Sequence, residues 1–328
     1  MSAPFHWAIL GLGKIARKFA EDLARIPDAR LVAVGSRSAE RAGAFAAEFG
    51  AGHAAGSYAA TFDGPRIDAV YVATPHTSHR ELTLLSLERG IPVLCEKPLG
   101  LNLAEVEEMV AAARRHGTYL LEALWSRFLP HSIAAFDLLR SGRIGTVESL
   151  RADFGFRGPD DPASRLWDPA LGGGALLDIG IYPVWLAQVV FGPPEAIAAT
   201  ARLTDRGVDA EIEVTLTHAG GRLAHCHATL LGRTKTEALI HGTEASLHLH
   251  PRFHEPSSFS VLTGKNDPPE NHYFPNKANG YQYEAEAVMA DVRAGKTEND
   301  LWTLTDSLAL HRTLTEVRRL VGVGYPGE

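Results

Sequence analysis

Two charged residues, Glu96 and Lys97, end an apolar run that has the composition of a buried strand. Ligands of parallel sheets bind beyond the carboxyl ends of the strands. A lysine at that edge either does chemistry or forms a buried ion pair, here with Glu96. Partial desolvation and a nearby positive charge would favour the neutral form of Lys97 and suit it to proton exchange. Lys97 is therefore a catalytic candidate, with the ion pair as the structural alternative.

A second group of polar residues lies in the glycine-rich and otherwise apolar segment 172–182, GGGALLDIGIY. Asp178 and Tyr182 are four residues apart, so a helix would place both side chains on one face. A carboxylate and a phenol among apolar neighbours need partners, and Lys97 would supply one. Pro183 would free the carbonyl of Ile179 and kink the helix. The structural alternative is a buried Asp–Tyr pair beside the glycines.

The segment 11–16, GLGKIA, has the G-x-G-x-x-A pattern between a predicted strand and a predicted helix. Gly11 permits a tight turn, Gly13 lets the backbone approach a pyrophosphate, and Ala16 allows close packing of helix on strand. The helix amino terminus, with Lys14 and Ile15, would offer free N–H groups to phosphates. The pattern predicts dinucleotide binding rather than a purely structural turn.

The end of the second predicted strand discriminates between NAD and NADP. An acidic residue about twenty positions after the glycines would bind the adenine ribose hydroxyls of NAD. This chain has Ser36 and Arg37 there, with Arg41 one turn into the next helix. A hydroxyl and guanidinium groups suit a ribose 2′-phosphate and favour NADP, with NAD still possible. The alternative is that both arginines are solvated surface cations.

The ends of the third and fourth predicted strands are also expected to touch the cofactor. Six residues lie there, with His79 equally suited to begin a helix: Thr74, Pro75, His76, His79, Glu96 and Lys97.

The elements that must position these residues change character near Leu124. Residues 7–13, 30–36, 67–75, 92–98 and 118–124 have the composition of strands, and helical patterns separate them. This alternation predicts a parallel, doubly wound sheet with helices on both faces, a Rossmann domain over 1–124. The fold class is therefore α/β.

Residues 125–328 predict a second, α+β domain. Helical patterns occur near 132–141, 175–190, 281–294 and 302–320, and strands near 147–157 and within 210–219, 221–231, 237–243 and 245–251. The alternating strands predict a large, open, mostly antiparallel sheet with one covered face. We expect the other face to be buried in a homodimer or homotetramer, and the domain to bind substrate.

Composition excludes several classes of protein. The formal net charge of −7 argues against a nucleic-acid binder. The sequence contains no run of about eighteen uncharged apolar residues, so a membrane span is not expected. The sequence enters a strand near His6 without a signal-peptide pattern. Two cysteines, Cys95 and Cys226, are too few for a disulfide framework and favour the cytoplasm. The histidines, including His225 and His227 on one strand, form no metal-ligand pattern, so no metal is expected.

Together, GLGKIA, EKP at 96–98 and GGGALLDIGIY make the chain resemble the Gfo/Idh/MocA oxidoreductases. The likeness covers most of the chain. The segments 93–110, 121–130, 152–156 and 173–184 are most similar to the branch of the dimeric trans-dihydrodiol dehydrogenases and NADP-dependent D-xylose dehydrogenases. The resemblance implies a small-molecule, polyhydroxylated substrate.

The resemblance also implies roles for individual residues. Lys97 would contact the substrate hydroxyl and the nicotinamide ribose, and Tyr182 would be the acid/base, where inositol dehydrogenase-like members carry histidine. Asp178 would orient the sugar or the lysine. Trp125 and Phe154 would line the substrate pocket, unless they are ordinary core residues. Trp167 would also stack on a ring, and the segment 251–281 would form the distal wall of the pocket.

The expected activity is reversible hydride transfer between NADP and a CH–OH carbon of a sugar, cyclic polyol or trans-dihydrodiol. One alternative is a reductase of a ketose, an anhydro-sugar or an imine. A second is a non-catalytic NADP-binding sensor, against which the joint presence of Lys97, Asp178 and Tyr182 argues.

Overall fold

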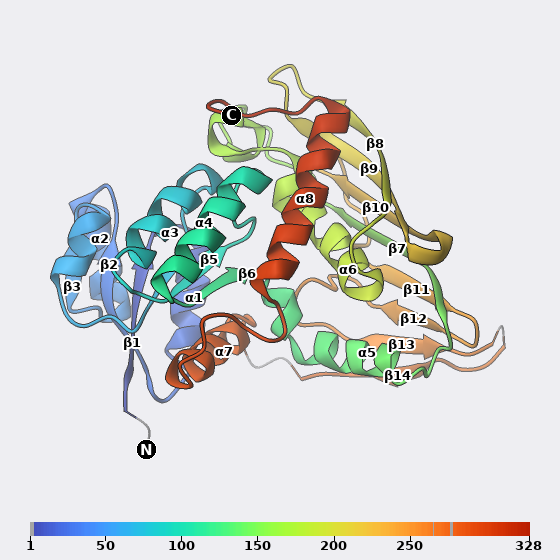
Figure 1. Cartoon of the computed structure of the whole chain (residues 1–328), viewed down its shortest axis with the longest axis horizontal. Helices are drawn as coiled ribbons and strands as arrows, with labels where there is room; N and C mark the ends of the chain where they lie inside the picture. Colours follow the sequence, from blue (N-terminus) through green and yellow to red (C-terminus); the bar gives the residue numbers. More distant parts are fainter. Residues whose placement is uncertain (1–2, 265, 276–277) are drawn as a thin grey trace. The chain divides into compact units, whose positions relative to one another are not determined.

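The computed structural model describes residues 3–264, 266–275 and 278–328. These residues form two compact units: 3–128 with 278–308, and 129–275 with 309–328 (Figure 1). The expected division placed all of 125–328 in a second domain. The observed division differs because the chain returns to the first unit after the second sheet.

The first unit contains a six-stranded sheet in the order β3-β2-β1-β4-β5-β6, and every neighbouring pair is parallel. The sheet therefore has the predicted Rossmann topology. Its strands are β1 (Phe5–Leu10), β2 (Ala29–Gly35), β3 (His53–Ala55), β4 (Ala69–Val72), β5 (Val93–Glu96) and β6 (Leu120–Ala123). The edge strand β3 was not predicted, since three residues are too few for a hydrophobic pattern.

Helices α1 (Lys14–Leu23), α2 (Ala39–Phe49), α3 (His79–Leu87) and α4 (Leu103–His116) connect these strands. Two of them begin with side-chain caps that their sequences encode. The Ser38 side chain accepts a hydrogen bond from the Arg41 N–H at the start of α2, and Asn102 accepts one from Glu105 at the start of α4. Such caps satisfy N–H groups that the first turn of a helix leaves without partners.

Helix α7 (Gln282–Arg293) belongs to the first unit because a buried carboxylate fastens the chain before it. Asp22, on α1, is fully buried and accepts hydrogen bonds from the N–H groups of Asn279, Gly280 and Tyr281. Helix α7 then packs on α1. Helix α8 (Leu304–Val321) begins in the first unit, and its residues from Ala309 onward belong to the second.

The second unit contains an eight-stranded sheet in the order β14-β13-β12-β11-β7-β10-β9-β8. All pairs are antiparallel except β7 with β10, as the prediction of a mostly antiparallel sheet requires. Its strands are β7 (Val147–Gly155), β8 (Ala196–Leu203), β9 (Asp209–His218), β10 (Arg222–Thr229), β11 (Ala238–Gly242), β12 (Ser246–Leu249), β13 (Phe259–Leu262) and β14 (Glu270–His272). Strands β8, β13 and β14 were not predicted. They lie toward the two edges of the sheet.

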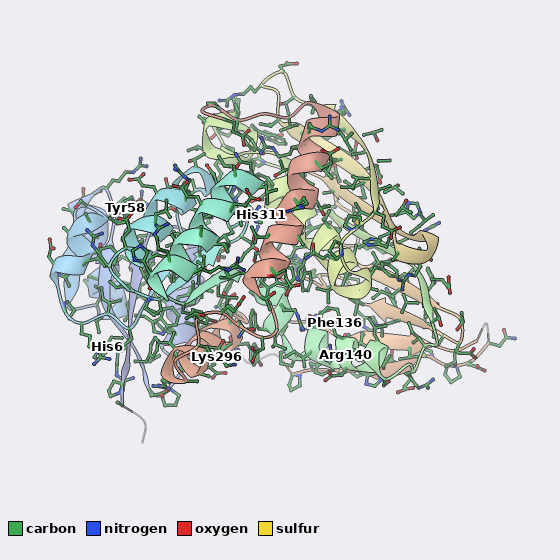
Figure 2. All side chains as sticks on the ribbon, in the orientation of Figure 1. His6, Tyr58, Phe136, Arg140, Lys296 and His311 are labelled. Atoms are coloured by element: carbon green, nitrogen blue, oxygen red, sulfur yellow. The ribbon has the colours of Figure 1, made fainter. Side chains whose placement is uncertain are left out.

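Helices α5 (Pro130–Arg140) and α6 (Ile181–Phe191) and the later turns of α8 lie on one side of this sheet (Figure 1). Phe136 of α5 packs against Trp185 of α6, with ring centroids 6.0 Å apart, whereas Arg140, one turn later, is exposed (Figure 2). The other face of the sheet carries polar side chains. His225 and His227 project from it beside Thr215 and Glu211, as their alternation with buried Cys226 predicted.

The helical run Pro169–Phe191 is long and apolar enough, by length and composition, to cross a membrane. In the structure 89% of its most apolar window is buried. Such burial is typical of a core helix, and this run packs on strands β7 and β10 through α6.

Candidate functional site

The glycine turn lies where β1 passes close to the end of β4. Gly11 has φ +89°, and a Cβ atom there would lie 2.6 Å from Thr74 Cγ2 and 2.8 Å from the Ala73 carbonyl oxygen. Only glycine fits this approach. In front of Gly13, by contrast, no heavy atom lies within 4 Å of an added Cβ. The turn therefore leaves open space at the start of α1.

The first turn of α1 differs from those of α2 and α4 because no side chain caps it. Its N–H groups and the positive end of the helix dipole are thus available to an anion. Thr74 adds a second feature, since its Oγ1 atom is buried and has no hydrogen-bond partner among the described residues. An uncapped helix start and a buried hydroxyl beside a Gly-x-Gly turn fit a dinucleotide.

The end of β2 places Ser36 and Arg41 near this turn. Ser36 is buried, and its Oγ accepts a hydrogen bond from the Ser38 N–H. The guanidinium of Arg41 reaches back to the Leu12 carbonyl oxygen, 3.3 Å away, inside the glycine turn. Arg37 is exposed. Arg41 therefore contributes positive charge beside the turn, and no acidic side chain stands at 36 or 37.

Lys97 follows β5, and hydrogen bonds fix the residues on both sides of it. Tyr71 on β4 donates its hydroxyl proton to a Glu96 carboxylate oxygen. The Leu99 N–H donates to Glu122 Oε1 at 2.9 Å. Lys97 itself is half-buried, between a buried glutamate and a buried proline. The backbone that carries this lysine is thus anchored to both neighbouring strands, β4 and β6.

His79 is the first residue of α3 and is fully buried. Its two ring nitrogens lie 2.8 Å from the Pro98 carbonyl oxygen and 2.9 Å from the Thr74 carbonyl oxygen. Burial lowers the pKa of His79, with a smaller contribution from the charge of Lys97, against the raising effect of the two carbonyls. The imidazole ring therefore links the segment that follows β4 to the segment that follows β5. His76, also buried, lies beside it, with ring centroids 5.7 Å apart.

The segment with Asp178 and Tyr182 is not the single α-helix that the sequence predicted. Leu176–Gly180 form a π turn, and α6 begins only at Ile181. Pro183 has no N–H to donate back to the preceding turn, and a π turn accommodates such an interruption. The π turn is wider than an α-helical turn, so Asp178 and Tyr182 are not one α-helical turn apart on a single helix face.

Asp178 has a partner that the sequence did not suggest. The guanidinium of Arg165 donates to Asp178 Oδ1 at 2.8 Å. The Asp178 side chain is nearly buried and that of Arg165 is half-exposed. Arg165 lies in the Gly/Pro/Asp-rich loop before the glycines, where nothing in the sequence distinguished it from other surface arginines.

Tyr182 lies in a cluster of rings within the second unit. Its ring centroid is 5.7 Å from that of Phe154 on β7 and 5.0 Å from that of His254, and Phe154 and His254 are 4.2 Å apart. His254 belongs to the segment 251–281 that was expected to line the pocket. In the first unit, Trp125 stacks on Tyr281, with centroids 4.4 Å apart and planes 5° from parallel.

Comparison with known proteins decides the family. Residues 5–123 match the model of an oxidoreductase family with an NAD-binding Rossmann fold, and residues 133–248 match the GFO/IDH/MocA C-terminal domain. The chain belongs to the Gfo/Idh/MocA oxidoreductase family. The predicted family and fold class are therefore confirmed.

Relatives within the Gfo/Idh/MocA family cover nearly the whole chain. A trans-1,2-dihydrobenzene-1,2-diol dehydrogenase of Danio rerio is 40% identical, over 98% of each chain. An aldose-aldose oxidoreductase from Caulobacter crescentus has a TM-score of 0.88 at 28% identity, over 97% of this chain and 98% of that one. A 3-ketoreductase from Actinomadura kijaniata, solved with NADP, has a TM-score of 0.87 at 27% identity over the same shares. This Gfo/Idh/MocA member is thus an NAD(P)-dependent oxidoreductase acting on CH–OH groups, and not merely a sensor.

Two buried acidic residues near the end of β5 in this Gfo/Idh/MocA chain, Glu122 and Glu284, were not predicted. Glu122 on β6 is fully buried and also accepts a hydrogen bond from the Ser307 hydroxyl at 2.7 Å. Its charge within the apolar run 118–124 was a signal that could have found it. Glu284 on α7 is fully buried, and both its carboxylate oxygens are without hydrogen-bond partners among the described residues. Burial, with a smaller effect of the Glu96 charge, raises the pKa of Glu284 well above its usual value.

Proposed function

We propose that this protein oxidises a CH–OH carbon of a ring-shaped, polyhydroxylated substrate, an aldose, a cyclic polyol or a trans-dihydrodiol, with NADP as the preferred cofactor. The observation that carries the proposal is the fixed backbone of Lys97, between Glu96 held by Tyr71 and Leu99 held by Glu122. Relatives that are named trans-1,2-dihydrobenzene-1,2-diol dehydrogenases, at 36–40% identity, support the substrate class.

The preference for NADP rests on the end of β2. Arg41 and Arg37 are cations beside or near the glycine turn, and Ser36 supplies a hydroxyl. A 2′-phosphate would gain charge-assisted hydrogen bonds from these groups, whereas NAD would find no carboxylate for its ribose hydroxyls. The 3-ketoreductase from Actinomadura kijaniata, which was solved with NADP, supports this preference. The uncapped first turn of α1 would bind the pyrophosphate.

Three residues of the chain would act on the substrate. NADP⁺, when bound, would supply the acceptor for the hydride that leaves the substrate carbon. Tyr182 would take the proton of the substrate hydroxyl, and the positive charge of Lys97 would hold the substrate oxygen. Asp178, oriented by Arg165 at 2.8 Å, accepts hydrogen bonds from neighbouring substrate hydroxyls.

Aromatic rings supply the surfaces that a ring-shaped substrate requires. Trp125, stacked on Tyr281, is proposed for one unit, and Phe154, with His254, for the other. Such faces bind the C–H surface of a sugar and the ring of a dihydrodiol through the same apolar contacts. Trp167 is a further candidate, and its indole N–H is hydrogen-bonded to the Pro159 carbonyl oxygen in its own loop at 2.8 Å.

The substrate and cofactor are tested by initial rates with trans-dihydrobenzenediol, D-xylose and inositol, each with NADP⁺ and NAD⁺. We expect turnover with NADP⁺, and a loss of kcat of about 10²–10⁴-fold in Tyr182→Phe, the usual contribution of an acid/base group. Unchanged turnover in Tyr182→Phe would contradict the proposed chemistry.

The cofactor preference is tested by titrating Arg41→Ala with NADPH and NADH. The variant should bind NADPH about 10–100-fold more weakly and NADH almost unchanged, since one charge-assisted hydrogen bond to the phosphate is lost. Arg66→Ala is a matched control, because Arg66 is an exposed cation of the same unit that pairs with Asp68 just before β4, whereas the glycine turn follows the carboxyl end of the neighbouring parallel strand β1. Equal weakening for both nucleotides in Arg41→Ala would refute the 2′-phosphate assignment.

We also propose a homodimer through the open face of the second sheet. On β10 this face carries Leu223, His225 and His227, and Leu223 is partly exposed despite its apolar side chain. Leu223→Glu should therefore shift the mass measured by light scattering from dimer to monomer. Leu320→Glu, which charges an exposed leucine of α8, should leave the mass unchanged.

We further propose a cytoplasmic location. Cys95 and Cys226 are both free and buried, as suits a protein of a reducing compartment. Cell fractionation with an antibody to the untagged protein tests this, and recovery from the secreted fraction would contradict it.

A further inference from the structure

The loop before the π turn is fastened by residues far away in the sequence. Gly173 in this loop presents its carbonyl oxygen to the hydroxyl of Tyr325, which donates a hydrogen bond of 2.7 Å. Tyr325 is buried and belongs to the segment that follows α8, and this segment lies beside the loop in Figure 1. The start of the segment bearing Asp178 and Tyr182 therefore depends on a side chain 152 positions further along the chain.

Tyr325 is itself fixed by an ion pair. The guanidinium of Arg318 lies 4.1 Å from the Tyr325 ring centroid and donates two hydrogen bonds to the carboxylate of Glu328. The same carboxylate accepts the Tyr325 N–H at 2.9 Å. The Arg318 side chain is almost fully buried, whereas that of Glu328 is 23% exposed. The ring thus has little freedom to leave Gly173.

A second contact fixes the other end of the loop. Asp209 on β9 is buried, and its Oδ2 accepts the Leu176 N–H at 2.6 Å. Its Oδ1 would lie 2.2 Å from a Cβ atom on Gly174. The short stretch from Gly173 to Leu176 is therefore held at its first residue by Tyr325 and at its last by Asp209.

We propose that Tyr325 is a positioning residue for Asp178 and Tyr182, acting through the Gly173 carbonyl. The inference rests on the proposed function, which assigns the chemistry to those two residues. Tyr325 is not a catalytic residue, because its hydroxyl proton is committed to Gly173. Burial, together with the nearby negative charges of Asp209, Glu328 and Asp178, raises the pKa of Tyr325 far above its usual value, despite the opposing charge of Arg318.

Loss of the Tyr325–Gly173 hydrogen bond should slow the chemical step. Gly173 precedes Asp178 by five residues, and the π turn begins three residues after it. Loss of the anchor would let the start of the turn move, and a displacement of about 1 Å of a catalytic group costs about 10²-fold in rate. The cofactor-binding turn and Arg41 belong to the first unit, so nucleotide affinity should not change.

Tyr325→Phe removes only the hydroxyl and tests the proposal. A matched control is Tyr119→Phe, because Tyr119 is a buried tyrosine of the first unit whose hydroxyl donates to Asp291 at 3.0 Å. We expect Tyr325→Phe to lower kcat by about three- to ten-fold, less than a full displacement of about 1 Å would cost, because Asp209 still holds Leu176; KM and the Kd for NADPH should not change. The primary deuterium isotope effect on kcat should rise, because the chemical step becomes slower. Tyr119→Phe should keep kcat.

Hydrogen exchange gives a readout that needs no substrate. In Tyr325→Phe, amides of residues 172–182 should exchange faster, whereas Tyr119→Phe should leave them unchanged. Glu328→Gln, which weakens the Arg318 pair, is a second variant and should act in the same direction. Unchanged exchange over 172–182, or a kcat that falls no more than in Tyr119→Phe, would overturn the proposal.

Tyr182→Phe, assayed alongside, separates the two failures. Full turnover in Tyr182→Phe would refute the proposed function. A large loss in Tyr182→Phe with wild-type kcat and exchange in Tyr325→Phe would refute the positioning role alone.

Discussion

Replacement of Gly174 by alanine tests the packing of the loop before the π turn. Gly174 has φ +118°, where L-residues are strained by about 1–3 kcal/mol. Its new Cβ would also lie 2.2 Å from Asp209 Oδ1. The carboxylate would have to move and would lose the Leu176 N–H, a buried hydrogen bond whose loss costs about 1–3 kcal/mol. We therefore expect Gly174→Ala to lower the free energy of unfolding of the second unit by about 2–6 kcal/mol.

Gly43→Ala is the matched control. Gly43 lies within α2, and no heavy atom would approach its Cβ within 4 Å. Alanine there should raise stability by about 0.5–1 kcal/mol, because glycine within a helix loses more conformational entropy on folding.

Urea unfolding followed by circular dichroism and tryptophan fluorescence measures both variants, and a change in midpoint at constant slope reports stability. A loss in Gly174→Ala below about 1 kcal/mol, or an equal loss in Gly43→Ala, would refute the reasoning from φ and Cβ distances.

Three further predictions concern buried ionisable groups. Burial and the Glu96 charge raise the pKa of Glu284, so the free energy of unfolding falls as pH rises above about 4.3, where the unfolded chain gives up this proton first. Glu284→Gln should therefore stabilise the protein more at pH 8 than at pH 5. An equal effect at both pH values would contradict this. Burial raises the pKa of Asp209 to about 7, so wild-type stability should fall between roughly pH 4 and pH 7, and urea midpoints for Asp209→Asn should show a weaker slope in that range. Burial raises the pKa of the Cys95 and Cys226 thiols too, so neither should react with a thiol reagent until urea unfolds the chain. Labelling of either cysteine in the native protein would contradict the burial of these side chains.

Local sequence was sufficient for the features that depend on neighbouring residues. The turn 11–16, the strands that precede and follow it, and Lys97 at the end of β5 were all predicted, because a parallel sheet imposes apolar strands and special turns at their ends. The family motifs indicated the activity for the same reason, since they lie in these turns. The short strands β3, β13 and β14 escaped prediction because so few residues carry no pattern.

Tertiary structure alone decided which distant residues lie near the candidate catalytic residues. Glu284 approaches the surroundings of Glu96 from a helix near the other end of the chain, and Arg165 pairs with Asp178 from a loop without a distinguishing motif. Tyr325 reaches Gly173 across 152 positions. Neither Arg165 nor Tyr325 carries a local sequence signal for its contact, because only folding brings these side chains within hydrogen-bond distance of Asp178 and Gly173.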